Sequence, residues 1–178
     1  MDKKHFWSII DKSLKHDGGQ DAQVAALRTA LEELTPDEIV GFQRCFDECM
    51  AESYHWDLWG AAYIIRGGCS DDGFMDFRSW LISKGEAVYN AALKNPETLA
   101  EAVVDSDTND DCQFEEFQYV PSQVWERKTR KDLSRFPTLE SEHPDSPAGE
   151  EWSEDGDDLE RRFPKLWKRF GPAQGGLG

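Results

Sequence analysis

The sequence has no run of about 18 apolar residues, the length that a helix needs to cross a bilayer. Asp11, Lys12 and Lys15 interrupt its first stretch before an apolar segment of signal-peptide length can form, so we expect a cytoplasmic protein with no membrane partner. Basic residues are few: 20 Lys and Arg stand against 36 Asp and Glu, and the net charge is −16. A chain this acidic repels phosphate backbones and attracts basic proteins, so we do not expect it to bind nucleic acid directly.

Disulfide and zinc signatures are also missing. The four cysteines form no CxxC pair, and in a cytoplasmic protein we expect them to be reduced thiols. Cys45 and Cys49 are spaced as neighbours on one helical face, which is more typical of two small core side chains than of a zinc site. We therefore expect no cofactor; a divalent metal stays open only at the acidic residues discussed below.

Strand signals are absent as well, because no segments of alternating β-branched residues are joined by Asn-Gly or Asp-Gly. What the sequence contains instead is helical periodicity and many aromatic residues. Seven tryptophans and ten phenylalanines supply the buried area that one domain of 178 residues needs. The clearest helix start is "LTPDE", in which Thr35 is a cap, Pro36 suits the first helical position and Glu38 completes a capping box.

Residues 54–66 and 70–84 predict a helical hairpin. The first of these segments is apolar on every side, which is typical of a buried helix, so we expect Trp59 at the buried centre of the fold. Gly67 and Gly68 end it, and Ser70 is expected to cap the second helix. We predict an all-α fold: a compact multi-helix domain with a central buried helical hairpin and an acidic, partly irregular C-terminal region.

The predicted organisation has three parts. Residues 1–136 form the α-helical domain. Residues 137–158 are rich in proline, serine and acid, which is typical of a loop. Residues 159–178 predict a basic and aromatic helix that docks on the same domain, although Pro164 limits its regularity.

Several blocks resemble one known family. They are "HFWSIID", "LTPDEIVGFQRCF", "YHWDLWGAAYIIRGGCSDDGFMDFRSWLISKG", "NPETLA", "FQYVPSQVWERKT" and "FPKLWKRFG". Together they resemble a bacterial family catalogued as domain of unknown function 4240. The resemblance implies a compact bacterial protein and implies no activity.

The block "GGCSDDGFMDFRSWL" contains the main candidate site residues. Asp72 and Asp76 are four apart on one helical face, where two carboxylates can hold a divalent metal or act as an acid–base pair, and Tyr54 or Asp57 can complete such a site. The other interpretation is structural. Asp71 and Asp72 then stabilise a helix N-terminus, and Arg78 pairs with an acid of a neighbouring helix.

Position separates Asp76 from the other acids. It lies one turn inside the helix, where a cap cannot use it, so an inward Asp76 needs a cation, either Arg or a metal. Cys69 precedes the helix N-terminus, where the pKa of a thiol can fall. Tyr54, Trp56 and Trp59 are candidates to line a pocket, although such a cluster, like His55 beside it, is more often part of a core or its rim.

A second acidic stretch, "DSDTNDDCQFEE", partly follows the calcium loop of an EF-hand. Its candidate ligands are Asp105, Asp107, Asn109 and Glu116, at the first, third, fifth and twelfth positions. At the sixth position Asp110 replaces the glycine that makes the sharp turn, so the pattern is incomplete.

Three classes of function stay open. The first is a non-enzymatic module, like an inhibitor or immunity protein, whose acidic surface binds a basic protein. The second is a small enzyme with a carboxylate-held metal around Asp72 and Asp76. The third is a calcium-responsive or purely structural module. The residues alone do not decide whether the protein is an enzyme.

Overall fold

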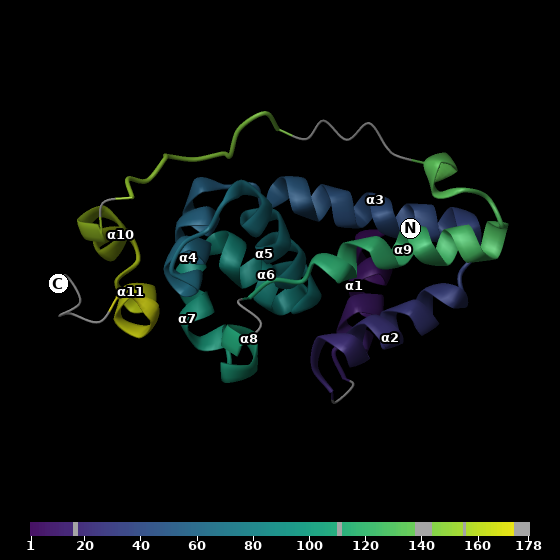
Figure 1. The fold of residues 1–178 in the computed structure, drawn as a ribbon, viewed down its shortest axis with the longest axis horizontal. Coiled ribbons are helices and arrows are strands. Elements are labelled where there is room, and N and C mark those ends of the chain that lie inside the picture. Colours follow the sequence, from purple (N-terminus) through teal and green to yellow (C-terminus); the bar gives the residue numbers. More distant parts are fainter. Residues whose placement is uncertain (16–17, 110–111, 138–143, 155, 173–178) are drawn as a thin grey trace.

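The computed structural model describes residues 1–15, 18–109, 112–137, 144–154 and 156–172 (Figure 1). The regular structure of these residues is helical, which confirms the all-α prediction, and their one strand-like pairing is an isolated bridge between His55 and Ala148. The helices are α1 (Lys3–Ser13), α2 (Gly19–Glu32), α3 (Pro36–Glu52), α4 (Trp56–Arg66), α5 (Asp71–Ser83), α6 (Glu86–Lys94), α7 (Leu99–Ala102), α8 (Asp105–Asn109), α9 (Glu115–Thr129), α10 (Gly156–Arg162) and α11 (Pro164–Phe170), with 3₁₀ turns η1 (Pro96–Thr98) and η2 (Leu133–Arg135).

Local capping signals set the start of α3. The Thr35 hydroxyl accepts a hydrogen bond from the Glu38 backbone N–H, and the Glu38 carboxylate accepts one from the Thr35 N–H at 2.8 Å. These two bonds form the predicted capping box, and Pro36 occupies the first turn. The same bonds hold the pKa of Glu38 below its usual value, because they favour the charged carboxylate.

The core lies where α3, α5 and α9 meet, with α1 and α2 packed beside them. Phe42 of α3, Phe77 and Trp80 of α5, and Phe117 of α9 are each 2% exposed or less. Pro121 lies inside α9 and does not end it. The hydroxyl of Ser79 on α5 donates to the Phe114 carbonyl at 2.7 Å, which joins α5 to the start of α9.

The two helices of the central hairpin are not equally buried. Helix α5 is covered from Phe74 to Ser83 on most of its surface, whereas α4 buries chiefly Leu58, Gly60, Ala61, Ala62 and Ile64. Trp59 is only partly buried, so the expectation that it lies at the buried centre was wrong. The all-round apolar pattern of α4 has another cause, because the chain's C-terminal part returns to cover one of its faces.

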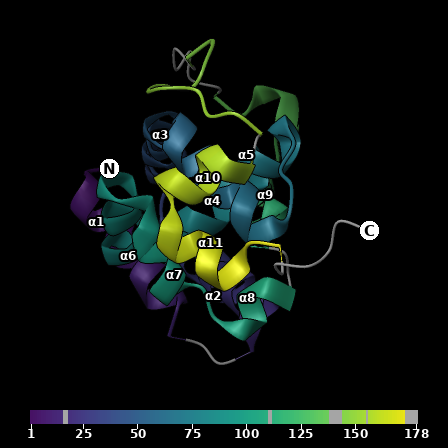
Figure 2. The same cartoon turned by 90° about the vertical axis from the view of Figure 1, so that its left-hand side faces the viewer.

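That return is made by two short helices rather than the single predicted one. Helix α10 ends at Arg162, and Pro164 begins α11, because proline has no N–H to extend the ladder of α10 but suits a first helical position. Figure 2 places α10 and α11 in front of α4 and α7. Of the predicted loop, residues 144–154 form no helix, and residues 138–143 and 155 lie outside the described part of the chain.

Candidate functional site

The N-terminus of α5 explains two of the candidate aspartates. The Ser70 hydroxyl accepts a hydrogen bond from the Gly73 N–H at 3.2 Å and caps the helix. Asp71 and Asp72 follow in the first turn, and both are exposed. Negative charge there stabilises the helix through its dipole, which is the structural interpretation of these two residues.

Asp76 is in a different position. Its Oδ1 atom is buried and has no hydrogen-bond partner among the described residues, although the side chain as a whole is only partly buried. Burial raises the pKa of Asp76, and the nearby negative charges of Glu115 and Asp72 raise it further, while Arg66 acts in the opposite direction. Among the described residues, no Lys or Arg forms an ion pair with Asp76.

The acidic pocket is the cavity beside Asp76, between the starts of α2 and α9 and one face of α5. Its volume is about 240 Å³. The carboxyl groups that face it come from three helices, and its lining includes no Lys or Arg. It is formed by Gln20, Asp21, Asp76, Gln113, Phe114, Glu115 and Glu116.

Arg66 forms hydrogen bonds with two segments beside the acidic pocket, the first turn of α5 and the residues before α9. Sequence analysis did not identify it as a candidate. Its Nη1 donates to the Gly73 carbonyl at 2.6 Å, and its Nη2 donates to Gln113 Oε1 at 3.2 Å. Gln20 Nε2 in turn donates to the Gln113 carbonyl at 2.7 Å. Because these partners are far apart in the sequence, no local pattern indicates the network.

Arg78 does not pair with an acid among the described residues, contrary to expectation. It is 4% exposed, and its Nη1 donates to the Met50 carbonyl at 2.6 Å. Its guanidinium lies 4.7 Å from the centre of the Tyr54 ring and 5.0 Å from that of Phe74, so ring faces replace the carboxylate. Burial lowers the pKa of Arg78 to about 10, which still leaves it charged at neutral pH.

The candidate aromatic residues form a stack rather than an open pocket. The Trp56 and Trp59 rings are 5.2 Å apart and nearly parallel, and Trp59 stacks on Phe74 at 5.0 Å. The indole of Trp59 donates to the Cys69 carbonyl at 3.0 Å. The structure thus brings Tyr54, Trp59, Phe74 and Arg78 together, while Asp76 lies beside the start of α9 and Asp72 is exposed.

His55 and Cys69 have local roles. His55 Nδ1 accepts a hydrogen bond from the Asp57 N–H at 3.2 Å and caps α4. The pKa of Cys69 is raised, because desolvation outweighs the opposing effect of Arg66, so its place before the helix N-terminus does not lower the pKa of the thiol. Asp57 lies 3.8 Å from Arg162 of α10 and is not adjacent to the acidic pocket.

The calcium-like stretch forms a helix over Asp105–Asn109 rather than an open loop. Asp107 is buried and paired with Lys84, accepts from the Trp80 indole at 3.3 Å, and accepts from the Val104 N–H at 3.0 Å. Glu116 lines the acidic pocket instead. The side chain of Asn109 and residues 110–111 lie outside the described part of the chain.

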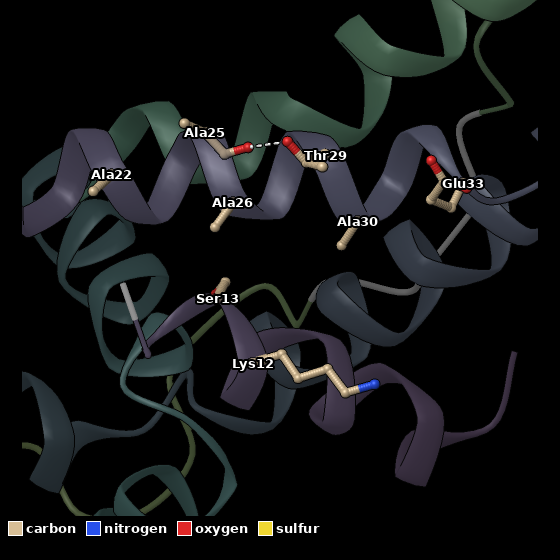
Figure 3. Close-up of a pocket in the computed structure, with 8 residues that line it drawn as sticks. All are labelled: Lys12, Ser13, Ala22, Ala25, Ala26, Thr29, Ala30 and Glu33. Atoms are coloured by element: carbon tan, nitrogen blue, oxygen red, sulfur yellow. Dashed lines mark hydrogen bonds between the residues drawn. The ribbon is translucent and has the colours of Figure 1, made fainter. Parts of the chain in front are cut away.

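The described residues contain no group of three or more His, Cys, Asp and Glu side chains placed to hold a metal ion. Another cavity, of about 520 Å³, is a groove between α1 and α2 (Figure 3). Alanines form half of its lining, with Lys12 and Glu33 as its charged residues. The groove therefore offers few groups for chemistry.

Comparison with known proteins agrees with the resemblance noted in the sequence. The model of a family described as protein of unknown function (DUF4240) matches residues 1–127. The chain belongs to the DUF4240 family. Neither the curated proteins nor the solved structures contain a match to it.

The DUF4240 match separates the domain that contains the candidate site residues from the C-terminal helices. It includes the acidic pocket, Arg78 and the aromatic stack, and it ends within α9. Helices α10 and α11, which cover α4, lie beyond it. None of the helices in the described ranges combines the length and the apolar character that a bilayer crossing requires.

Proposed function

We propose that this DUF4240 protein is a non-enzymatic binding module, of the inhibitor or immunity type, whose acidic pocket receives a basic side chain of a partner protein. The observation that supports this most is the buried Oδ1 atom of Asp76, which has no partner in the described structure. A Lys or Arg side chain from a partner supplies the missing donor and the missing positive charge together.

Electrostatics favour such an occupant. Burial raises the pKa of Asp76, and the negative charge of Glu115 raises it further, so the two carboxylates disfavour each other. An inserted cation removes this repulsion and lowers the pKa of Asp76 again, so binding near the pKa of Asp76 releases a proton. The net charge of −16 adds a long-range attraction that accelerates the encounter with a basic partner and weakens with salt.

The metal-enzyme alternative gains less from the geometry. It requires Asp72 and Asp76 to face one site, but Asp72 is exposed in the first turn of α5 and is not part of the pocket lining. No observation on the described residues favours it over the binding module, and stabilisation of the protein by an added divalent metal ion would be the result that supports it.

The test compares two variants with the same change in net charge. The pocket variant combines Asp76→Asn, Glu115→Gln and Glu116→Gln. The control variant combines Glu33→Gln, Asp37→Asn and Glu101→Gln, which alter exposed acids outside the pocket.

The probe is an oligolysine peptide, titrated by calorimetry at low ionic strength. We expect the pocket variant to bind it at least about fivefold more weakly than wild type, about 1 kcal/mol, and the control variant to stay close to wild type. If both variants lose affinity equally, binding follows total charge and the pocket is not the contact. Capture of host proteins on both variants then identifies the natural partner.

A further inference from the structure

The C-terminal segment, residues 148–154 and 156–170, packs against one end of the DUF4240 domain. Its main contacts fall on residues 54–63, at the start and middle of α4, and on 96–102, in η1 and α7. Figures 1 and 2 show α10 and α11 at one end of the molecule, against α4 and α7. We call this part of the domain the α4–α7 face.

Aromatic and leucine side chains anchor the segment. Trp152, Leu159, Phe163 and Leu166 are all 8% exposed or less. Trp152 lies 4.9 Å from Tyr63, ring centre to ring centre. Leu159, Phe163 and Leu166 are three or four positions apart but belong to two short helices, because Leu159 lies in α10, Phe163 precedes α11 and Leu166 lies in α11.

Gly60 is the position of α4 on which the Phe163 and Trp152 rings pack, and we call it the seat. A Cβ atom at this position would lie 2.8 Å from the Phe163 ring and 3.1 Å from the Trp152 ring. The nearest atoms to that Cβ all belong to the C-terminal segment. Glycine in the middle of a helix is unfavourable by itself, so its position here serves the close approach of these two rings.

Polar contacts orient the segment. Arg162 donates to the carbonyls of Glu150 and Glu151 at 2.9 and 3.0 Å, and lies 3.8 Å from the Asp57 carboxylate. The Glu97 carboxylate accepts from the Lys165 N–H at 2.6 Å, at the N-terminus of α11. The face thus contributes carboxylates, and α11 itself carries Lys and Arg but no acid.

The C-terminal segment packs incompletely against the α4–α7 face. The Trp152 indole N–H is buried and has no hydrogen-bond partner among the described residues, which costs free energy. A cavity of about 470 Å³ also remains between the two parts, with Asp57 and Glu97 on the side of the domain and Glu150 and Arg162 on the other. A partner segment that fills this cavity and leaves no buried donor unpaired at the place of the Trp152 indole can compete with the C-terminal segment for the α4–α7 face.

We infer that the α4–α7 face is a docking surface for a helical segment of another protein that carries aromatic and leucine anchors beside basic residues. The chain's own C-terminal segment, which lies beyond the DUF4240 match, occupies this surface in cis and must leave before the partner binds. This surface is separate from the acidic pocket, so the inference does not depend on the proposed function.

Two full-length variants separate the surface from its occupant. The anchor variant, Leu159→Ala with Phe163→Ala, weakens the segment and leaves the face unchanged. The seat variant, Gly60→Leu, displaces the segment and also fills its seat. The probe is a labelled synthetic peptide of residues 146–172 of this chain, followed by fluorescence anisotropy.

We expect both variants to be cut by trypsin at Arg161 and Arg162 at least tenfold faster than wild type, with little change in their helical circular dichroism. The anchor variant should bind the peptide at least tenfold more tightly than wild type, and the seat variant should not bind it. The inference is wrong if trypsin cleavage is unchanged in both, or if the peptide binds all three proteins equally.

Gly60→Ala and Arg162→Ala provide a milder pair if either variant unfolds. They should show the same order of trypsin cleavage and peptide binding with smaller changes, with cleavage followed at Arg161 alone because Arg162→Ala removes the second site. Loss of the helical signal in this pair as well would mean that the segment is part of one indivisible core, which would overturn the inference.

Discussion

Replacing Arg78 by methionine tests whether a buried cation without an acid partner stabilises this fold. Methionine keeps most of the length of the side chain and its contacts with the Tyr54 and Phe74 rings, but it removes the charge and the donor to the Met50 carbonyl. The alanine variant at the same position also removes the stem and leaves a cavity.

The expected magnitude follows from opposing contributions. Burial lowers the pKa of Arg78 from its usual value to about 10, which corresponds to a desolvation cost of roughly 3 kcal/mol for holding the charge inside. The hydrogen bond from a charged donor returns about 1.5–3 kcal/mol, and the two ring contacts return about 1 kcal/mol. These contributions nearly cancel, so we expect Arg78→Met to change the free energy of unfolding by less than about 1 kcal/mol. Arg78→Ala should lose about 2–4 kcal/mol, because it adds a cavity.

Urea unfolding at pH 7, followed by the helical circular dichroism signal, measures both free energies. Because the pKa of Arg78 is lowered, the folded state loses its proton near pH 10, and the unfolded state loses it only at higher pH. Below pH 10 both states keep the proton, so neither difference should vary between pH 6 and 9. A loss above about 3 kcal/mol in the methionine variant would refute the reasoning, because it would mean that the bonds of Arg78 far outweigh its desolvation.

Three further predictions concern stability. Asp76→Asn should melt at or above the wild-type temperature at pH 7 and lose this advantage near pH 4. The pKa of Asp76 is raised, so the wild-type protein loses stability as the pH rises through that pKa. The amide of asparagine does not ionise and removes this loss. Wild-type stabilisation by added Mg²⁺, Mn²⁺ or Ca²⁺ that disappears in this variant would instead support a metal site. Ser70→Ala should lose about 1 kcal/mol in urea unfolding, whereas Ser70→Asp should retain the cap. Trp59→Ala should lower the free energy of unfolding by about 2 kcal/mol. This is less than the about 3–5 kcal/mol of a fully buried aromatic residue, because Trp59 is partly exposed. A wild-type midpoint of urea unfolding would show that the stacking of Trp59 contributes nothing.

The parts of the fold that depend on neighbouring residues were predictable. Thr35 and Ser70 cap helices because their partners are three residues away, and Pro36 fits the first turn for the same reason. The all-α class follows from the same local periodicity. The DUF4240 resemblance also rests on contiguous blocks of sequence, and the family match confirms it.

The parts that depend on distant residues were not predictable in this way. The apolar faces of α4 suggested a buried centre, but one face is covered by Trp152 and Phe163, about a hundred residues away. Arg78 was expected to meet a carboxylate and instead meets a carbonyl and two rings. Periodicity indicates which side of a helix is apolar, and it does not indicate which segment covers that side.

The distribution of tryptophans has a practical consequence. Trp152 and Trp167 belong to the C-terminal segment, and Trp56 and Trp59 stack at or beside the surface that receives it. Near-parallel indoles at this separation couple their electronic transitions, and the edge-on Trp152 adds a third chromophore to the pair. Four of the seven tryptophans lie at this end of the molecule, so tryptophan emission will respond to detachment of the segment, while amide absorption reports on all helices. Two spectra of one sample will distinguish detachment of the segment from unfolding of the domain.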